Sequence, residues 1–388
     1  MSYKILTLNN ISVKGLRRLP RDTFEVASEI GHPDAVLLRS YNMHDMDIPA
    51  TVQAIGRAGA GVNNIPIDAM THRGVPVFNA PGANANAVKE LVIAGMLLAA
   101  RNICPAWRYV QELEAEGAAL NKLVEAGKKK FVGFELPART LGVVGLGAIG
   151  GEVANAAHSL GMRVIGFDPQ LTVERAWQLS SGIEQARSLD DLFSRADIVS
   201  FHVPLNDATR NLANAERIAL MPEGSVLLNF ARGGIVDDEA VESALAGNRL
   251  AAYVTDFPVA GLKDHPRVVA LPHLGASTGE AEENCAIMVA NNVRDYLENG
   301  NIRHSVNFPE AQMPREGDNR LTIANMNVPN MVGQISTCLA DAGLNIHDML
   351  NKSRGEIAYT LVDLDGSMSD ETMQRIRGID GVLSARLV

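Results

Sequence analysis

The sequence predicts an α/β protein with two doubly wound parallel sheets and a small third module. Three observations support this. Short apolar strands alternate with helical segments over residues 1–308, which is typical of parallel sheets with crossover helices. An apolar run near the middle ends in a glycine-rich turn that opens a helix. Residues 319–388 show the order β-α-β-β-α-β of a ferredoxin-like module. A chain of 388 residues is also too long for a single ordinary hydrophobic core, so more than one domain is expected.

The strands of the first sheet are expected at residues 3–8, 35–38, 52–55 and 75–78. One helix should cover residues 84–101, followed by a polar stretch to Lys130 that is rich in Glu and Lys. The second series of strands is expected at residues 164–167, 198–202, 225–229, 251–255 and 268–271, and a helix over 278–299 would return the chain to the first sheet. The prediction is therefore a nucleotide domain (96–276) inserted into a substrate domain (1–95 and 277–308), with a ligand cleft between them.

The third module should follow a linker over residues 309–318, which contains two prolines and four charges. Its strands are expected at residues 320–324, 346–349, 357–363 and 382–387, and its helices at 332–342 and 370–376.

The glycine-rich turn is the most specific motif. Gly145, Gly147 and Gly150 form G-x-G-x-x-G between a strand and a helix, and Asp168 ends the next strand. The first glycine permits the tight turn, the second lets the backbone approach a pyrophosphate, and the third lets helix and strand pack closely. The carboxylate can bind both ribose hydroxyls and would repel a 2′-phosphate. The motif therefore predicts a Rossmann domain that binds NAD rather than NADP.

Composition excludes several other functions. The net charge of −10 argues against nucleic-acid binding, and the only basic run, Lys128–Lys130, is expected to be a solvated loop. Three distant cysteines favour a reducing compartment without disulfides or a metal site. The first residues resemble a strand rather than a signal peptide, and the apolar stretch Leu91–Ala100 is too short to span a bilayer. The expected location is the cytoplasm.

Two side chains at predicted strand ends can carry chemistry. Arg232 follows a buried strand and precedes two glycines, so its guanidinium can hold a carboxylate through two parallel hydrogen bonds. His273 lies just after another strand, where an imidazole near a nicotinamide can take the proton of a hydroxyl group as hydride leaves. His202 is expected to pack near the cofactor rather than to take part in the reaction.

Together these motifs resemble the D-isomer-specific 2-hydroxyacid dehydrogenases, and in particular those acting on D-3-phosphoglycerate. The supporting segments are residues 54–63, 75–84, 141–150, 229–234 and 272–278. The resemblance implies that Arg232 holds the substrate carboxylate and that His273 is the general acid/base. It implies a flavodoxin-like substrate domain. In that domain the loop formed by Arg57, Ala58 and Gly59 binds substrate together with Asn84. Arg57 and Arg39 are suitable cations for a phosphate group. The expected cofactor contacts are Gly145, Gly147, Ala148, Ile149, Gly150, Asp168, His202, Val203, Pro204, Thr209, Ala231, Asp256 (or a residue beside it, at the nicotinamide carboxamide) and Gly275.

One departure from the family concerns the partner of the histidine. The family usually has a glutamate a few residues after the Asp256 region, hydrogen-bonded to the catalytic histidine. Here no glutamate lies between Asp256 and His265. Asp264 could substitute, or Lys263 could reach the cleft, and the partner of His273 stays open.

The last residues resemble an ACT domain, a small amino-acid-sensing module. The resemblance makes Asn325, Asn327 and Asn345 contact candidates for an L-serine effector, since amides can donate to a carboxylate and accept from an ammonium. The alternative is a dimerisation module without a ligand. ACT domains usually pair across a two-fold axis, so a homo-oligomer, a dimer or a tetramer, is expected.

The expected function is NAD-dependent oxidation of 3-phosphoglycerate to 3-phosphohydroxypyruvate, the first step of L-serine biosynthesis, with possible regulation by serine. Two alternatives stay open. The enzyme could act on another D-2-hydroxy acid, such as glycerate or D-lactate, or the chain could be a non-catalytic, NAD-sensing binding protein.

Overall fold

The computed structural model describes residues 2–316 and 319–388, which form two compact units. One unit contains the chain up to Ala83 together with Gly279–Val388, and the other is Asn84–Thr278. The first segment of the substrate domain, predicted to end at residue 95, ends earlier in the structure. The reason is that the whole of α3 (Ala85–Ala100) packs in the second unit through Val92 and Met96. The predicted linker 309–318 ends in residues 317 and 318, which lie outside the described residues.

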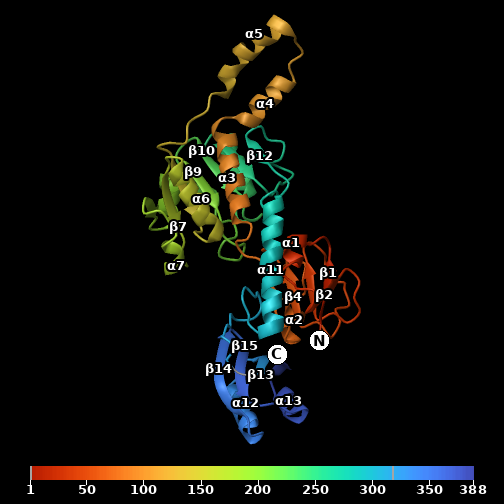
Figure 1. Ribbon diagram of the computed structural model, residues 1–388. Helices are drawn as coiled ribbons and strands as arrows, with labels where there is room; N and C mark the ends of the chain where they lie inside the picture. Colours follow the sequence, from red (N-terminus) through yellow and green to blue (C-terminus); the bar gives the residue numbers. More distant parts are fainter. Residues whose placement is uncertain (1, 317–318) are drawn as a thin grey trace. The chain divides into compact units, whose positions relative to one another are not determined.

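The second unit is built on one parallel sheet in the order β12-β11-β10-β9-β6-β7-β8 (Figure 1). The strand order reverses between β6 and β9, so ligands are expected at the carboxyl ends of these strands. The strands β6, β9 and β10 are buried throughout because helices cover both faces. The five predicted strands are confirmed, and the short, largely exposed β8 was not predicted. The elements are β6 (Thr140–Val144), α6 (Ala148–Ser159), β7 (Arg163–Phe167), α7 (Val173–Ala176), β8 (Ile183–Gln185), α8 (Leu189–Arg195), β9 (Ile198–Phe201), α9 (Ala215–Leu220), β10 (Ser225–Asn229), α10 (Asp238–Ala246), β11 (Leu250–Thr255) and β12 (Val268–Ala270).

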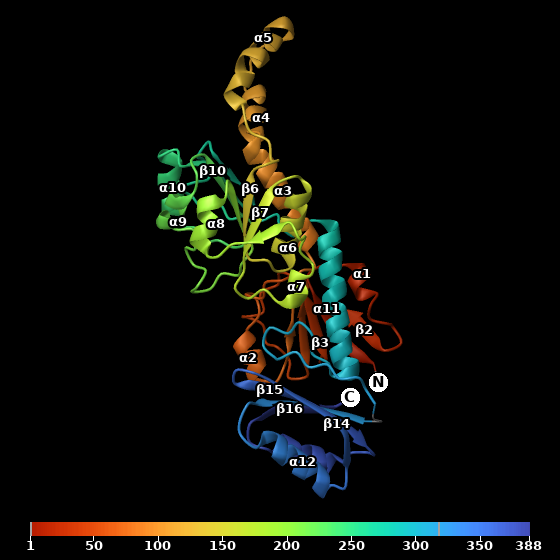
Figure 2. The ribbon, with the colours of Figure 1, turned by 90° about the vertical axis from the view of Figure 1, so that its left-hand side faces the viewer.

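A helical arm extends from this unit where the sequence indicated only a polar stretch (Figure 2). It contains α4 (Ile103–Gln111), α5 (Gly117–Gly127) and the 3-10 turn η1 (Lys128–Phe131). The lysines of η1 are exposed as expected, but they form a helical turn and not a loop. Tyr109 joins the two helices, because its hydroxyl donates to the Leu123 carbonyl at 2.9 Å. The arm has almost no core, and Trp107 is 66% exposed.

The first unit contains a parallel sheet in the order β2-β1-β3-β4-β5. The strand β2 was not predicted, since Phe24 is its only buried side chain. The strands β4 and β5 each begin two residues later than predicted, because Val52 and Val75 are buried in the preceding turns. The helix α11 packs on β4 through Val289 and Val293. The elements are β1 (Tyr3–Leu8), α1 (Val13–Leu16), β2 (Phe24–Ala27), β3 (Ala35–Leu38), β4 (Ala54–Arg57), α2 (Ile67–His72), β5 (Val77–Phe78) and α11 (Gly279–Asn299).

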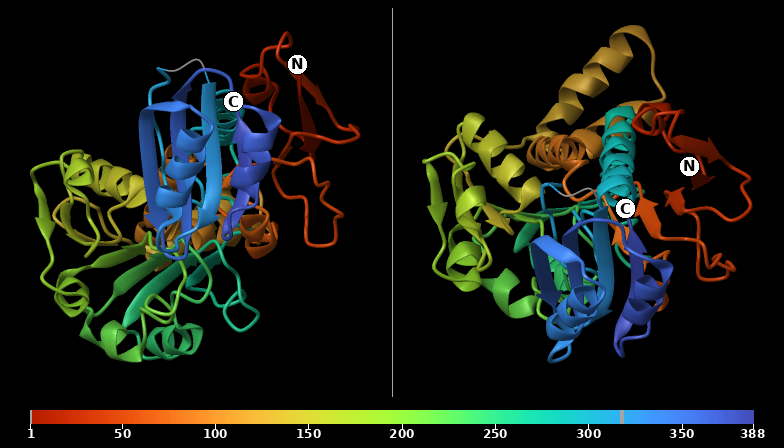
Figure 3. Two further views of the ribbon diagram at one scale, coloured as in Figure 1. Left: turned by 90° about the horizontal axis from the view of Figure 1, so that it is seen from below. Right: turned by 60° about the horizontal axis from the view of Figure 1, so that its bottom comes forward.

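The C-terminal module has the predicted β-α-β-β-α-β order, and its antiparallel sheet runs β14-β15-β13-β16. The helices α12 and α13 lie together on one face of this sheet (Figure 3). The strand β14 is longer than predicted, because its polar second half keeps pairing with β15 up to a turn at Gly355, where φ is +60°. The elements are β13 (Asn319–Met326), α12 (Met331–Asp341), β14 (Asn345–Arg354), β15 (Ile357–Asp365), α13 (Asp370–Arg377) and β16 (Val382–Leu387).

The opposite face of this sheet packs on the rest of the first unit. Tyr359 and Leu361 belong to the same core as α11. Arg320 and Asp363 form a fully buried bidentate ion pair, with the Arg320 Nε and Asp363 Oδ1 atoms 2.6 Å apart. The Arg320 guanidinium also donates to the Asn299 carbonyl at the end of α11, so the module is fixed to that helix end. Among the described residues, no helix combines the length and apolar character needed to cross a membrane.

Candidate active site

The glycine turn between β6 and α6 has the geometry that dinucleotide binding requires. Gly145 has a φ of +89°, which side-chain-bearing residues rarely adopt. A Cβ on Gly150 would lie 1.9 Å from the Gly145 carbonyl oxygen, whereas a Cβ on Gly147 would meet nothing within 4 Å. Gly147 is the N-cap of α6, and no side chain caps this helix end, so the N–H groups of its first turn can bind phosphate.

Asp168 lies at the end of β7, beside the same turn. Its Oδ2 accepts the Leu146 N–H at 2.9 Å, and its Oδ1 accepts the Gln170 N–H at 2.9 Å. These bonds hold the carboxylate in place, and each oxygen still has a second lone pair for a ribose hydroxyl. The residues present therefore fit NAD. Gly147, Ala148 and Ile149 would hold its phosphates, and Asp168 would hold its adenosine ribose.

Alanine substitutions at two glycines should separate packing from cofactor binding. Gly150→Ala forces its methyl group onto backbone, so we expect a loss of about 1–3 kcal/mol in stability together with loss of NADH binding. Gly147→Ala should fold like the wild type, because its methyl group meets no protein atom, yet it should bind NADH at least about tenfold more weakly by obstructing the pyrophosphate. Thermal unfolding and NADH fluorescence titration measure both. Wild-type affinity in Gly147→Ala would contradict the assignment.

The loop after β9 carries His202, Val203, Pro204 and Thr209. The His202 N–H donates to the Val144 carbonyl at 2.8 Å, and its Nε2 lies 2.9 Å from the Ser200 hydroxyl. Burial lowers the pKa of His202 to about 3, so the imidazole is neutral at physiological pH. The Thr209 hydroxyl donates to the Pro204 carbonyl at 2.6 Å and closes the loop.

The depressed pKa of His202 predicts a pH-dependent stability. The unfolded histidine gains a proton below pH 6.5, whereas the folded one does so only near pH 3, so stability present above pH 6.5 is lost as the pH falls through this window. Between pH 7 and pH 5 the wild type should lose about 2 kcal/mol more than His202→Asn, as measured by urea unfolding. His32→Asn, which changes an exposed histidine, is the control and should behave like the wild type.

Arg232 lies in the loop that follows β10, and Asn229 holds that loop. Asn229 is buried, donates from Nδ2 to the Arg232 carbonyl at 2.9 Å and accepts the Ala231 N–H at 3.2 Å. Arg232 itself is exposed, and among the described residues it forms no ion pair. A guanidinium presented in this way is available for an anionic ligand. Sequence reasoning missed Asn229, although a polar residue ending an apolar strand was a usable signal.

His273 lies in the loop after β12 with an unusual backbone. Its φ is +56°, in the left-handed region, which costs on the order of 1–3 kcal/mol for a residue other than glycine. Its exposed ring packs against Phe257 with 4.9 Å between centroids, and within the described chain the imidazole makes no hydrogen bond. Lys263 and Asp264 pair with each other at 3.0 Å, and Asp264 is 83% exposed, so neither supplies the missing partner.

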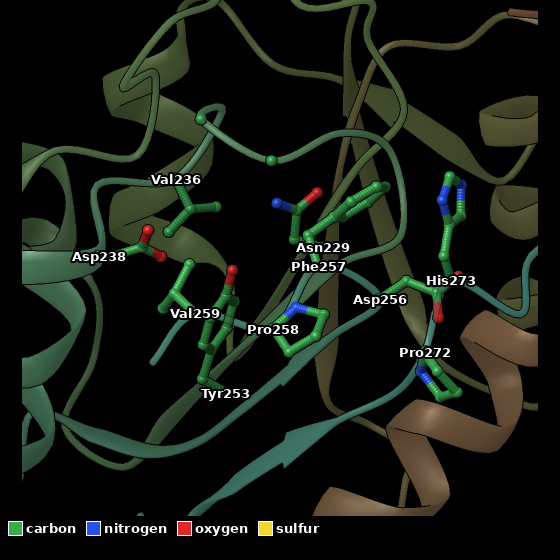
Figure 4. A pocket seen from close by; sticks show the side chains of 12 residues that line it. Asn229, Val236, Asp238, Tyr253, Asp256, Phe257, Pro258, Val259, Pro272 and His273 are labelled. Carbon is green, nitrogen blue, oxygen red and sulfur yellow. The ribbon is translucent and has the colours of Figure 1, made fainter. Parts of the chain in front are cut away.

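Asp256 directly follows β11 and lies beside this loop. It is 1% exposed, and its two oxygens accept the Leu274 and Gly275 N–H groups at 2.8 Å each. Its expected contact with the nicotinamide carboxamide stays a prediction. A pocket of about 470 Å³ opens here, and its lining includes Gly233 and Gly234. Phe257 and His273 also line it (Figure 4). The loops of Arg232 and His273 therefore border one cavity.

The expected substrate-binding residues divide between the units. In the first unit, the Arg57 Nε donates to the Arg39 carbonyl at 3.0 Å, and Ala58 and Gly59 follow directly. The Arg39 Nη1 pairs with the Glu282 Oε1 at 2.7 Å, a partner that the sequence did not indicate. Asn84 precedes α3 in the second unit, and its Oδ1 has no hydrogen-bond partner in the described part of the chain.

The three expected serine contacts lie at opposite ends of the ACT-like sheet. Asn325 pairs with Ala358 on β15, and Asn327 donates to the Gly355 carbonyl at 3.0 Å. Asn345 pairs with Asp365, which lies seven positions beyond Ala358 on β15, a distance of about 24 Å along the strand. One copy of the module therefore does not bring the three amides together.

Comparisons with known proteins agree with this geometry. Residues 93–275 match the family described as "D-isomer specific 2-hydroxyacid dehydrogenase, NAD binding domain". The chain is 35% identical over 348 residues to the D-3-phosphoglycerate dehydrogenase of Escherichia coli strain K12, covering 86% of this chain and 81% of that one. It is 34% identical over 347 residues to the same enzyme of Haemophilus influenzae, with the same shares covered.

Solved structures show the same fold. The NAD⁺-bound 3-phosphoglycerate dehydrogenase of Entamoeba histolytica superposes with a TM-score of 0.60 at 26% identity, covering 79% of this chain and 99% of that one. The holo D-mandelate dehydrogenase of Rhodotorula graminis superposes with a TM-score of 0.68 at 24% identity, covering 80% of this chain and 100% of that one. At this identity the likeness shows the fold alone. The glycine turn, Asp168 and the loops of Arg232 and His273 thus lie in a fold known to bind NAD. The chain belongs to the D-isomer-specific 2-hydroxyacid dehydrogenases, the NAD-dependent oxidoreductases that include the D-3-phosphoglycerate dehydrogenases.

Proposed function

We propose that the protein is an NAD-dependent D-3-phosphoglycerate dehydrogenase that interconverts 3-phosphoglycerate and 3-phosphohydroxypyruvate, the first step of L-serine biosynthesis. One observation carries the proposal: in the unit that contains the dinucleotide turn, one pocket is lined by the exposed His273 and by Gly233 and Gly234, which directly follow the exposed Arg232. The names of the relatives, at 34–35% identity over most of the chain, support the phosphorylated substrate.

In this mechanism Arg232 binds the substrate carboxylate through its two parallel N–H donors, which fixes the C2 carbon in the pocket. His273 takes the proton from the C2 hydroxyl during oxidation and returns it to the oxygen during reduction. NAD, when bound, accepts the hydride. Arg39 and Arg57 supply the charge for the phosphate group.

The test is NADH oxidation by the purified protein with 3-phosphohydroxypyruvate, compared with hydroxypyruvate, glyoxylate and pyruvate. We expect kcat/KM to be at least about 100-fold higher for the phosphorylated acid, because a paired phosphate contributes several kcal/mol. Preference for an unphosphorylated acid would make the chain a different dehydrogenase of the family. NADH binding without turnover of any 2-oxo acid would favour the NAD-sensing binding protein.

We also propose that the protein is a cytoplasmic homo-oligomer whose ACT-like module binds L-serine. The strand β14 is an unpaired edge of ten residues, long enough to pair with a second copy. Antiparallel pairing about the middle of β14 would bring Asn345 of one copy to the Arg354 end of β14 in the other, near Gly355, whose carbonyl Asn327 binds. Asn325 lies two strands further in, on β13. Three unpaired cysteines suit a reducing compartment.

The exposed apolar side chains of the arm, Ile103, Trp107 and Val110, support a further contact between copies. Sedimentation measures assembly, and the NADH assay with added serine measures regulation. A monomer whose turnover is indifferent to serine would contradict both proposals.

A further inference from the structure

We infer that Asp256 is a positioning residue that holds His273 by binding the backbone of its loop, in place of a carboxylate bound to the imidazole. The inference deepens the proposed function and rests on it for the role of His273. The structural part, in which the Asp256 carboxylate binds the backbone of the His273 loop, does not depend on the proposed function.

The contact is a carboxylate in a backbone nest. Leu274 and Gly275 point successive N–H groups at the two oxygens of Asp256, both at 2.8 Å. The left-handed φ of +56° at His273 turns these N–H groups to the same side, the geometry by which successive amides bind an anion. The bonds are charge-assisted, and Asp256 is 1% exposed, so water does not weaken them.

The same arrangement fixes the imidazole. Phe257 follows Asp256 directly, and its ring packs against the His273 ring with 4.9 Å between centroids. Asp256 in turn is tied to the sheet, because its N–H donates to the Asn229 carbonyl at 3.0 Å. Since Asn229 holds the Arg232 loop, the two loops are held by neighbouring residues at the ends of paired strands.

The bonds from Asp256 matter more here because no hydrogen bond from another described residue to the imidazole itself orients His273. Lys263 and Asp264 pair with each other, and the imidazole has no hydrogen bond in the part of the chain that the structure describes. The orientation of His273 therefore depends on its backbone and on Phe257. A shift of about 1 Å at a reacting group can cost about 100-fold in rate.

The test compares Asp256→Asn with Asp264→Asn. Asparagine at 256 keeps the shape of the side chain but accepts only one of the two N–H groups. Asp264→Asn removes an equal charge from the same segment at a position that is 83% exposed. Amide hydrogen exchange of residues 271–278 is measured without NADH or substrate, alongside kcat, KM and the NADH dissociation constant.

We expect the Leu274 and Gly275 amides of the wild type to be protected, although Leu274 is 39% exposed. In Asp256→Asn their exchange should accelerate at least about tenfold and kcat should fall about 100-fold, with NADH affinity within about twofold. Asp264→Asn should match the wild type in every measurement.

Three results would overturn the inference: unprotected amides in the wild type, kcat unchanged in Asp256→Asn, or a loss of NADH affinity with kcat retained at saturating NADH. The last would place Asp256 at the cofactor. The wild-type exchange data need no variant to fold. A wild type without turnover but with both amides protected would refute the proposed function and leave the backbone grip standing.

Discussion

Replacing Arg232 by alanine is expected to lower kcat/KM for 3-phosphohydroxypyruvate about 1000-fold, while NADH affinity stays within about twofold. The loss follows from removing one partner of a bidentate, desolvated ion pair, which costs about 4 kcal/mol. Arg232→Lys keeps the charge but not the planar pair of donors, so an intermediate loss of about 10- to 100-fold is expected. Steady-state kinetics and NADH fluorescence titration give both quantities.

Arg163→Ala is the matched control, because it removes an exposed arginine from the start of β7, away from the strand ends that form the site. It should leave kcat/KM unchanged. The loop that carries Arg232 is fixed by Asn229 through backbone atoms, so the substitution should not disturb folding. Full activity of Arg232→Ala would assign the carboxylate to another cation and remove the central support for the mechanism.

The features that the sequence predicted well are those set by local pattern. The strand at 225–229 and the turn at Gly145 depend on contiguous apolar residues and on glycines that the backbone requires, so both are confirmed at the predicted positions. The β-α-β-β-α-β order of the C-terminal module was also predicted correctly. The arm was missed because its helices bury almost nothing and lie in a stretch rich in Glu and Lys, although Ile103, Trp107 and Val110 of α4 recur at helical spacing.

The details of the site that could not be predicted depend on contacts between distant residues. Asp256 binds N–H groups 18 and 19 positions further along the chain, and only the folded β11 and β12 bring them together. The same holds for Glu282, which reaches Arg39 from α11. A motif supplies the residue types, whereas the sheet determines which carboxylate holds which loop.

Replacing His273 by alanine should remove proton transfer and lower kcat by about 100- to 10,000-fold. KM for 3-phosphohydroxypyruvate should change little, because Arg232 and the phosphate-binding cations are intact, and this separates the effect from that of Arg232→Ala. Added imidazole should restore part of the turnover, since the exposed position leaves room for a small base where the ring stood. His72→Ala, at an exposed histidine of the first unit, is the control. A wild-type kcat in His273→Ala, or a loss that appears only in KM, would mean that the proton passes through another group. The strained backbone at His273 would then hold a binding residue rather than the general acid/base.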